Sequence, residues 1–366
     1  MQFLPGAPRM RIKNQIFDLY LRFFIKVLEL LKIVEWTSNI DLQNIEGLQF
    51  VVVDEARRRN LKIENLLKKG THTRFFRIKK EKKYYYFESL PIGDSYNRVS
   101  SEAVSNKWFV KRVLQKAGLP TPDGKSISSF REAMDYIEKK GFPVVIKPLN
   151  ESKCIGVTVN IKNEKELKEA IDYVREYGKN FLIEEFLPGK NFRLTVVDGV
   201  LVAACLRKHP RVIGDGKHTV NELIKIKNKD ERRGLSKNST LRPITIDNFT
   251  REILREQRES LSSVPLKGKT IVLNKRINLG VGADTYDVTE TVHREIIQLS
   301  IRVALLVEAK LLGLDILARD ISKPISRENP VFVIEVNPYP FIDMHHYPYE
   351  GKPRNVAGAI LDMLFK

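Results

Sequence analysis

Charged residues recur every three or four positions between residues 14 and 36, which is the period of an amphipathic helix. These charges argue against a membrane-spanning segment. The helix must place its apolar face against the protein core, against a second copy of the chain, or on a membrane surface. The pattern leaves these three settings open. The apolar face comprises Ile16, Phe17, Leu19, Tyr20, Phe23, Phe24, Val27, Leu30 and Leu31.

The following pattern predicts a small α/β unit. The apolar run 48–53 is typical of a strand, and a helix-like stretch begins at Glu55. Apolar and polar residues then alternate over 74–78 and 84–87, which predicts two further strands. The unit ends near Ser95.

From Ser101 onwards, strand and helix patterns are interleaved. Strands are expected within 142–148, 157–161, 181–187, 192–197, 200–205 and 270–273, and two later strands are expected to carry Asp320 and Glu335. Helices are expected around Lys107, up to Lys140, over 164–177 and 290–312, and over much of the charged stretch 221–258.

The last two expected strands carry oxygen ligands. Glu335 and Asn337 lie two positions apart in an extended segment and therefore point to the same side, and a neighbouring strand with Asp320 could add a second carboxylate. Two carboxylates and an amide suit Mg²⁺, which often completes its shell with nucleotide phosphates. Acids on strands are usually solvated surface, but Glu335 directly follows the apolar run 331–334, where an unpaired charge is costly.

A lysine at the end of another expected strand indicates phosphate binding. Lys147 stands immediately before the loop 149–156, and a strand follows that loop. A cation beside a hairpin loop suits a phosphate group.

Composition indicates which kinds of molecule the chain could bind. The 366 residues are long enough for two or three packed subdomains, and 63 Lys and Arg against 45 Asp and Glu give a formal charge of +18. This charge favours an anionic partner. The basic residues are interleaved with acids along the expected helices, so most of them form solvated faces, and nucleic-acid binding rests on charge alone.

Cysteine usage indicates the compartment. The chain has two cysteines, Cys154 and Cys205, and its first apolar stretch carries charges throughout and lacks a small-residue cleavage site. These features predict a reduced, cytoplasmic protein.

The order of the segments resembles the ATP-grasp superfamily, in particular the ligase modules of cyanophycin synthetase and of the bifunctional glutathione synthetases. The likeness runs from about Ser101 to the end, with a weaker likeness over 45–95. It is carried by the segments 106–107, 144–148, 183–187, 192–193, 212–220, 277–279, 313–320, 335–338 and 344–365.

The resemblance implies an α+β fold in which two α+β subdomains grip ATP. The ATP-grasp domain would cover 101–366, with its ATP-binding small subdomain at about 120–190. A small α/β pre-ATP-grasp domain at 41–100 and an N-terminal amphipathic helical segment at 1–40 would precede it.

The resemblance also implies an ATP site. Lys107 and Lys147 would neutralise the phosphates, which is an electrostatic role, and Glu184 would accept a hydrogen bond from the adenine amino group. Asn191 stands near the position where the family commonly has a ribose-binding carboxylate. The nucleotide-binding residues are expected to be Lys107, Lys147, Gly156, Glu184, Glu185, Phe186, Leu187 and Asn191.

The implied reaction is carboxylate–amine ligation. Asp320, Glu335 and Asn337 match the family's Mg²⁺ ligands, with Mn²⁺ as a substitute metal. A substrate carboxylate would attack the γ-phosphorus of ATP, and an amine would then displace phosphate from the acyl phosphate. The expected substrates are amino acids or acidic peptides, and the expected assembly is a homo-oligomer.

Four further residues are assigned by resemblance. Arg276 and Asn278 lie in the loop that in relatives helps to hold the transferring group, where an arginine suits the charge, and Lys275 is the alternative to Arg276. Arg193 and Arg354 are candidates for binding substrate. Capping of the last helix is the alternative role for the segment that contains Arg354.

Two departures from the family keep a second function class open. The family arginine usually stands four residues before Asn278, where this chain has Asn274. The phosphate loop has a single glycine, Gly156, where relatives have several. These departures favour a catalytically weakened, nucleotide-binding regulatory or assembly module.

Overall fold

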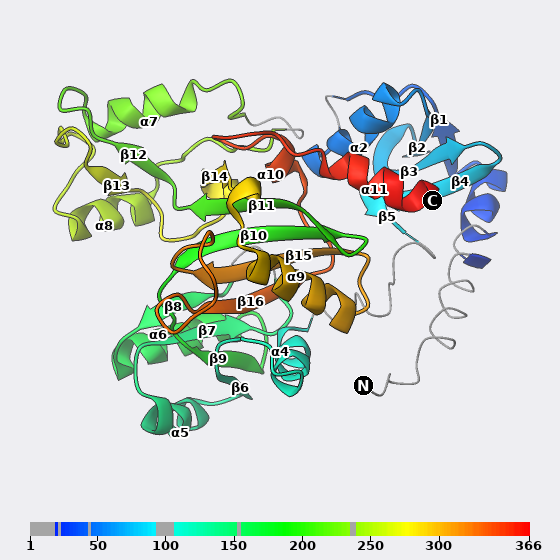
Figure 1. The fold of residues 1–366 in the computed structure, drawn as a ribbon. Coiled ribbons are helices and arrows are strands. Elements are labelled where there is room, and N and C mark those ends of the chain that lie inside the picture. The colour runs from blue at the N-terminus through cyan, green and yellow to red at the C-terminus, as the bar shows by residue number, and fades with distance from the viewer. Residues whose placement is uncertain (1–18, 21–22, 43–44, 93–105, 152–154, 235–238) are drawn as a thin grey trace.

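The computed structural model describes residues 19–20, 23–42, 45–92, 106–151, 155–234 and 239–366, and these residues form four antiparallel sheets with flanking helices (Figure 1). Predictions for the remaining residues, including Cys154, lie outside the described residues. Each sheet has its own apolar cluster.

The first sheet has the order β1-β2-β3-β4-β5 and is covered by α2 and by the C-terminal helix α11. The prediction of a strand at 48–53 is wrong, because these residues belong to α2. Val51, Val52 and Val53 are all buried, since this helix is enclosed between the sheet and α11, and an apolar run of that kind does not distinguish helix from strand. The elements are β1 (Val34–Thr37), α2 (Gly47–Arg58), β2 (Lys62–Lys68), β3 (Thr71–Lys80), β4 (Lys83–Glu88), β5 (Leu90–Pro91) and α11 (Val356–Phe365).

The N-terminal helix ends earlier than its charge pattern predicts, and residues 14–18 and 21–22 of that pattern lie outside the described residues. It ends at residue 30, and the chain enters β1 at Val34. Ile25 and Leu28 pack against Val34 and Leu66, whereas the opposite side of the helix is exposed. Core packing therefore accounts for one side of the helix. Among the described residues, no helix has both the length and the hydropathy needed to cross a membrane.

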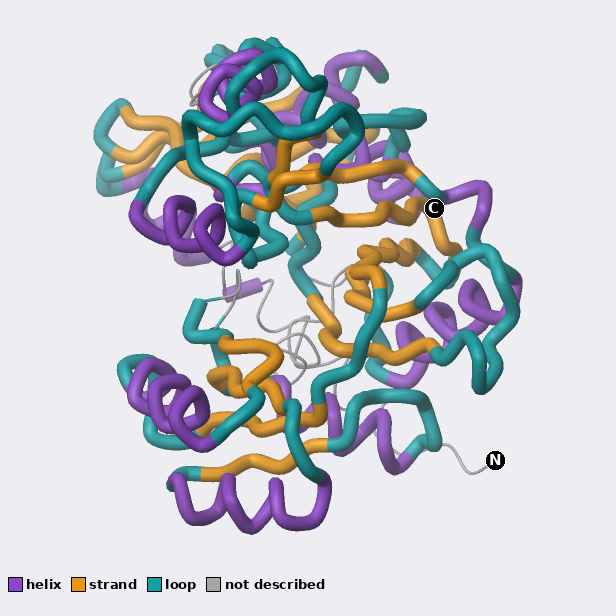
Figure 2. Tube along the Cα trace, turned by 90° about the vertical axis from the view of Figure 1, so that its left-hand side faces the viewer, coloured by secondary structure: helices purple, strands orange, loops and turns teal. Residues whose placement is uncertain are grey.

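The second sheet has the order β6-β9-β7-β8 and lies at the bottom of Figure 1, below the central sheet. Two helices cover one of its faces and bury Ile137, Leu167 and Ile171 against it. Figure 2 shows the same group from the side as a separate layer of strands and helices. The elements are β6 (Gly124–Ile127), α5 (Phe130–Lys140), β7 (Val144–Pro148), β8 (Thr158–Ile161), α6 (Glu164–Arg175) and β9 (Phe181–Glu185).

The central sheet has the order β14-β11-β10-β15-β16. Many of its apolar side chains pack against α9 and α4, whereas the other face carries polar residues, and Val197, Ala203 and Leu311 join the cluster of the first sheet. The helix predicted over 290–312 ends earlier, at Leu306, because Leu311 already begins a buried strand. The elements are α4 (Lys107–Lys116), β10 (Lys190–Val197), β11 (Val200–Lys208), β14 (Asp284–Asp287), α9 (Arg294–Leu306), β15 (Leu311–Ala318) and β16 (Val331–Asn337).

The fourth group pairs β12 with β13 and adds two helices. The charged stretch 221–258 is helical only in these two segments, and the residues between them that the structure describes are irregular. The elements are β12 (Arg211–Ile213), α7 (Val220–Asn228), α8 (Asn248–Glu256), β13 (Thr270–Val272), η1 (Leu279–Val281) and η2 (Thr289–Thr291).

A short helix, α10 (Asp343–His346), carries two buried histidines. His345 Nε2 lies 2.9 Å from the hydroxyl of Thr195, and His346 Nε2 accepts a hydrogen bond from the Ala357 N–H at 3.1 Å. Burial lowers the pKa of His345 to about 3 and the pKa of His346 to about 4.

Stability is therefore expected to fall as the pH is lowered from 7 to 5. Both histidines stay neutral in the fold, while in the unfolded chain they take up protons near pH 6.5, so acid favours unfolding. Each is expected to remove about 2 kcal/mol from the free energy of unfolding at pH 5. Urea titrations at pH 7, 6 and 5 measure this, and His346→Asn should flatten the dependence. Equal stability at the three pH values would contradict it.

Candidate active site

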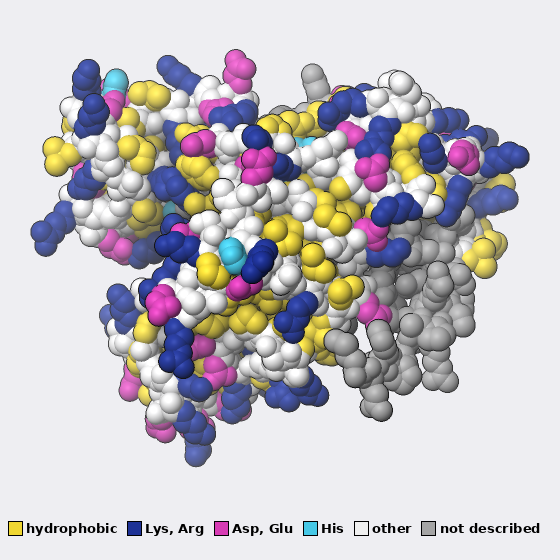
Figure 3. Space-filling model, viewed as in Figure 1, with side chains coloured by type: hydrophobic (Ala, Val, Ile, Leu, Met, Phe, Trp, Pro, Cys, Tyr) yellow, Lys and Arg dark blue, Asp and Glu magenta, His cyan; other side chains and the backbone are white. Residues whose placement is uncertain are grey.

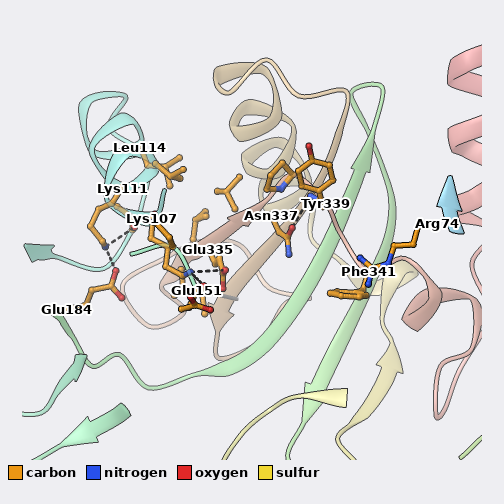
Figure 4. Close-up of a pocket in the computed structure, with 17 residues that line it drawn as sticks. Arg74, Lys107, Lys111, Leu114, Glu151, Glu184, Glu335, Asn337, Tyr339 and Phe341 are labelled. Atoms are coloured by element: carbon orange, nitrogen blue, oxygen red, sulfur yellow. Dashed lines mark hydrogen bonds and ion pairs between the residues drawn. The ribbon is translucent and has the colours of Figure 1, made fainter. Parts of the chain in front are cut away.

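A cavity of about 400 Å³ lies where α4, β16 and the start of the loop after β7 meet (Figure 4). Four of the residues predicted from the sequence line it: Lys107, Glu184, Glu335 and Asn337. Arg74 of β3 also reaches its wall, so the first sheet contributes to the same cavity. The structure thus brings predicted nucleotide-binding and metal-binding residues into one space.

A β-bulge sets the direction of Glu335. Val333 and Val336 of β16 are buried in the central cluster, and between them stand two residues instead of one. Glu335 pairs with Asp315 and Val333 pairs with Ile316, so Ile334 is the extra residue. In an unbroken strand Glu335 would share the buried side of Val333. The bulge turns it to the polar face.

The carboxylate opposite Glu335 is Asp315, in the middle of β15. The predicted partner, Asp320, lies two residues beyond the end of that strand and accepts hydrogen bonds from the backbone and hydroxyl of Ser322. The expectation that a neighbouring strand carries Asp320 is therefore wrong, because β15 ends at Ala318. On the sheet itself, the acid that faces Glu335 is Asp315.

Two arginines hold Asp315. Arg193 is its neighbour on β10 and donates to Oδ1, and Arg207 of β11 donates to Oδ2 at 2.6 Å. Arg207 also donates to the Asn191 side chain at 2.8 Å. Burial raises the pKa of Asp315, but the two guanidinium groups outweigh it and hold that pKa below the usual value. Arg193 Nη1 is buried without a protein partner, so this cluster retains an unused donor.

Lys107 stands at the first turn of α4, where Asn106 caps the helix by accepting from the Phe109 N–H at 2.9 Å. Its Nζ donates to the carbonyl of Glu151 and lies 3.7 Å from Glu335 Oε1. Burial lowers the pKa of Lys107, and Glu335 partly offsets this effect. The lysine therefore connects the loop after β7 with β16.

One helical turn further along α4, Lys111 completes a buried chain of charges. Its Nζ lies 2.8 Å from Glu184 Oε1, and Lys147 Nζ lies 2.7 Å from Glu184 Oε2. Burial opposes the charge on Glu184, but Lys147 and Lys111 together hold its pKa below the usual value. Lys147 also donates to the Ile334 carbonyl at 3.3 Å. Glu184 is thus an ionised acceptor fixed by two cations.

The residues after Glu184 are held by backbone contacts. The Phe186 N–H donates to the Pro143 carbonyl at 3.1 Å, and the Glu185 carboxylate accepts from the Asp123 N–H at 2.7 Å. Leu187 follows them, beyond the end of β9. Gly156 has φ +68, and an added Cβ would lie 2.7 Å from the Tyr177 ring, so this turn requires glycine.

Eleven of the fifteen predicted site residues lie outside the cavity lining, and Arg276, Asn278 and Arg354 are among them. Arg276 donates to the Tyr173 hydroxyl of α6 at 3.5 Å, and the side chain of Asn278 accepts from the Gly280 N–H at 2.7 Å. Arg354 is paired with Asp287 at 2.6 Å and with Glu290 at 3.3 Å. Next to it, Asn355 caps α11 through the Gly358 N–H at 2.8 Å, which is the alternative capping role.

The donor set fits a hard cation. Glu335 and Asn337 offer oxygen atoms at the cavity, and Asp315 lies opposite Glu335 on the same sheet with its two oxygens already accepting from Arg193 and Arg207; oxygen ligands are what Mg²⁺ prefers. Within the described ranges, no group of three or more His, Cys, Asp or Glu that could hold a metal ion is found. A metal held here would take two carboxylates and an amide from the protein and its further ligands from a substrate or water.

Sequence reasoning missed Asp315, Lys111 and Arg207. Asp315 is a lone charge inside the apolar stretch 311–318, which is the same signal that distinguishes Glu335. Lys111 follows Lys107 by four residues and hence lies on the same helix face. Arg207 gives no such signal, because its role depends on how β10 and β11 pair.

Known proteins are similar to this chain in sequence. The family model described as "Phosphoribosylglycinamide synthetase, ATP-grasp (A) domain" matches residues 105–222. Cyanophycin synthetase of Trichormus variabilis is 37% identical over 267 residues, which is 72% of this chain and 29% of that protein. The glutathione biosynthesis bifunctional protein GshAB of Enterococcus faecalis is 29% identical over 360 residues, which is 91% of this chain and 47% of that protein.

A solved structure agrees with the fold. The bifunctional glutathione synthetase from Pasteurella multocida superposes with a TM-score of 0.69 and 26% identity, covering 88% of this chain and 44% of that one. The chain thus spans less than half the length of these relatives. Fold, motif order and sequence similarity agree: the chain is an ATP-grasp domain protein related to cyanophycin synthetase and the bifunctional glutathione synthetases.

Proposed function

We propose that the chain is an ATP-dependent carboxylate–amine ligase, which forms an amide bond through an acyl phosphate and releases ADP and phosphate. The observation that carries this proposal is the shared cavity, where Lys107 and Glu184 line the same space as Glu335 and Asn337. Similarity to two groups of synthetases supports the same reaction class.

Cations and acceptors are arranged for a nucleoside triphosphate. Glu184 would accept from the adenine amino group, and Lys107 and Lys147 would neutralise the phosphates. Asp315, Glu335 and Asn337 would hold Mg²⁺, or Mn²⁺ in its place. When bound, the metal supplies charge neutralisation at the phosphate oxygens. In this proposal Asp315 takes the place that the sequence assigns to Asp320.

The reaction needs no protein nucleophile. A substrate carboxylate oxygen attacks the γ-phosphorus, the bond to the β-phosphate oxygen breaks, and ADP leaves. The amine nitrogen then attacks the acyl carbon, the bond from carbon to the phosphate oxygen breaks, and the amine loses a proton. Arg193 and Arg207 donate to Asp315. In this proposal they would also stabilise the negative charge on the phosphoryl group as it moves from ATP to the substrate carboxylate.

The substrates are proposed to be amino acids or acidic peptides. A formal charge of +18 favours anionic substrates, and Arg74 adds a cation at the cavity wall. The relatives are longer than this chain, so their complete reactions are not assumed for it. Assembly into a homo-oligomer stays a prediction. For the N-terminal helix, the exposed apolar side favours contact with a membrane surface.

Phosphate release tests the reaction. The full chain is incubated with ATP, Mg²⁺ and pooled amino acids and acidic dipeptides, and hydroxylamine is added to trap an acyl phosphate as a hydroxamate. Turnover that requires an acid, together with hydroxamate formation, supports the ligase. ATP binding without turnover across broad pools would instead favour the regulatory or assembly module.

Lys111→Met is expected to reduce the preference for ATP over GTP about tenfold, since one charge-assisted contact to Glu184 is lost. With one lysine left, Glu184 takes up a proton more readily and can donate to the 6-oxo group of guanine. Calorimetric Kd values for both nucleotides give the ratio. Lys116→Met, an exposed change on the same helix, is the control. Equal weakening for both nucleotides would show a merely structural role.

A further inference from the structure

The outer side of the N-terminal helix is the largest concentration of exposed apolar side chains along the described part of this chain. Phe23 is 66% exposed and Leu30 is 77% exposed. The rings of Tyr20 and Phe24 stack on each other with centroids 6.4 Å apart. Large apolar patches of this kind mark interaction sites. The outer side comprises Leu19, Tyr20, Phe23, Phe24, Leu30 and Leu31.

The helix is fixed to the first sheet by its inner side. Ile25 and Leu28 pack with Val34 and Leu66, and the Ile33 N–H donates to the Leu28 carbonyl at 2.9 Å where the chain turns into β1. The outer side chains therefore cannot be buried by rotation of the helix without loss of this contact. They present a preformed apolar ridge.

Basic residues border the end of this ridge. Lys32 follows Leu31, and Val34 pairs with Lys68, which places the turn at Lys68 and Lys69 beside the helix end. All three lysines are exposed, and Lys26 adds a fourth on the helix itself. Glu29 and Glu35 are the acidic neighbours. Figure 3 shows apolar side chains bordered by Lys and Arg at the right-hand edge of the molecule.

The combination of an apolar ridge with a basic border points to one partner. We propose that this surface docks on an anionic lipid bilayer, with the aromatic and leucine side chains at the acyl boundary and the lysines at the headgroups. A second copy of the chain fits less well, because a two-fold contact with parallel helices would bring the same lysines together, and an antiparallel contact would make no use of them. Such docking is independent of the ligase reaction.

Vesicle sedimentation tests the proposal on the full chain. Wild type is expected to bind vesicles of phosphatidylcholine with 30% phosphatidylserine, but not vesicles of phosphatidylcholine alone, and 0.5 M salt is expected to weaken the binding. Phe23→Ser with Leu30→Ser should lower the partition coefficient at least about tenfold. Phe249→Ser with Leu266→Ser is the matched control, because these residues are also 66% and 77% exposed, on the fourth group of elements.

A second variant tests the electrostatic part. Replacing Lys32, Lys68 and Lys69 with Gln should remove the salt dependence, since these lysines supply the attraction to the headgroups. Absence of wild-type binding to the anionic vesicles would overturn the proposal. So would equal loss in the ridge variant and its control, or a dimer in light scattering that only the ridge variant dissociates.

Discussion

Glu335→Gln is expected to lower ATP-dependent phosphate release at least about 10³-fold, while the fold and its capacity to bind nucleotide remain. The substitution keeps the shape of the side chain and removes the negative charge that lies opposite Asp315 on the sheet. Glu335 Oε1 lies 3.7 Å from Lys107 Nζ. Loss of this long ion pair should change the free energy of unfolding by less than about 1 kcal/mol.

This experiment separates chemistry from folding. Phosphate release, the Kd for ATP and the urea midpoint are measured on the same preparation. Glu328→Gln is the control, because it removes an exposed carboxylate from the loop between β15 and β16. If the Glu335→Gln variant keeps more than a tenth of wild-type turnover, Glu335 is not an essential metal ligand.

Asp315→Asn is expected to have the second largest effect, on stability and turnover together. The change leaves Arg193 and Arg207 buried beside a neutral side chain, and breaking a buried ion pair of this kind costs about 3–5 kcal/mol. It also removes the carboxylate opposite Glu335, so turnover should fall together with the affinity for Mg²⁺.

Asp320→Asn is the matched substitution. Asp320 is solvent-exposed and is held by Ser322, so the variant should unfold at a urea midpoint close to that of wild type and retain turnover. The Mg²⁺ dependence of phosphate release is compared for the two variants. If Asp320→Asn raises the Mg²⁺ requirement and Asp315→Asn does not, the metal set predicted from the sequence is the right one.

Much of the ATP-grasp region could be predicted, because its strands alternate and its helices carry caps and breaks that a single sequence displays. Most expected strands between Lys147 and Cys205 agree with the structure to within a few residues. The failures lie where burial is complete on all sides. The run that contains Val51 to Val53 looks like a strand because its helix is enclosed between a sheet and α11, a helix from the far end of the chain.

The site was predictable where one side chain carries its own signal. Glu335 and Asn337 are conspicuous beside an apolar run, and both line the cavity. The carboxylate opposite Glu335 could not be predicted, since a choice between Asp315 and Asp320 requires knowledge of how β15 pairs with β16. Periodicity also gives no warning of the extra residue at 334, because a bulge is defined only against its neighbouring strand.

The bulge has a consequence for cooperativity. Because Ile334 has no partner on β15, its carbonyl can accept from Lys147, and Lys147 also holds Glu184. One ammonium group is therefore shared between the residue proposed to meet the nucleotide base and the strand that carries the proposed metal ligands. Nucleotide and metal should then each raise the affinity for the other by the same factor. Removal of Ile334 would leave every other residue pair of β16 in place and bring this coupling factor toward one.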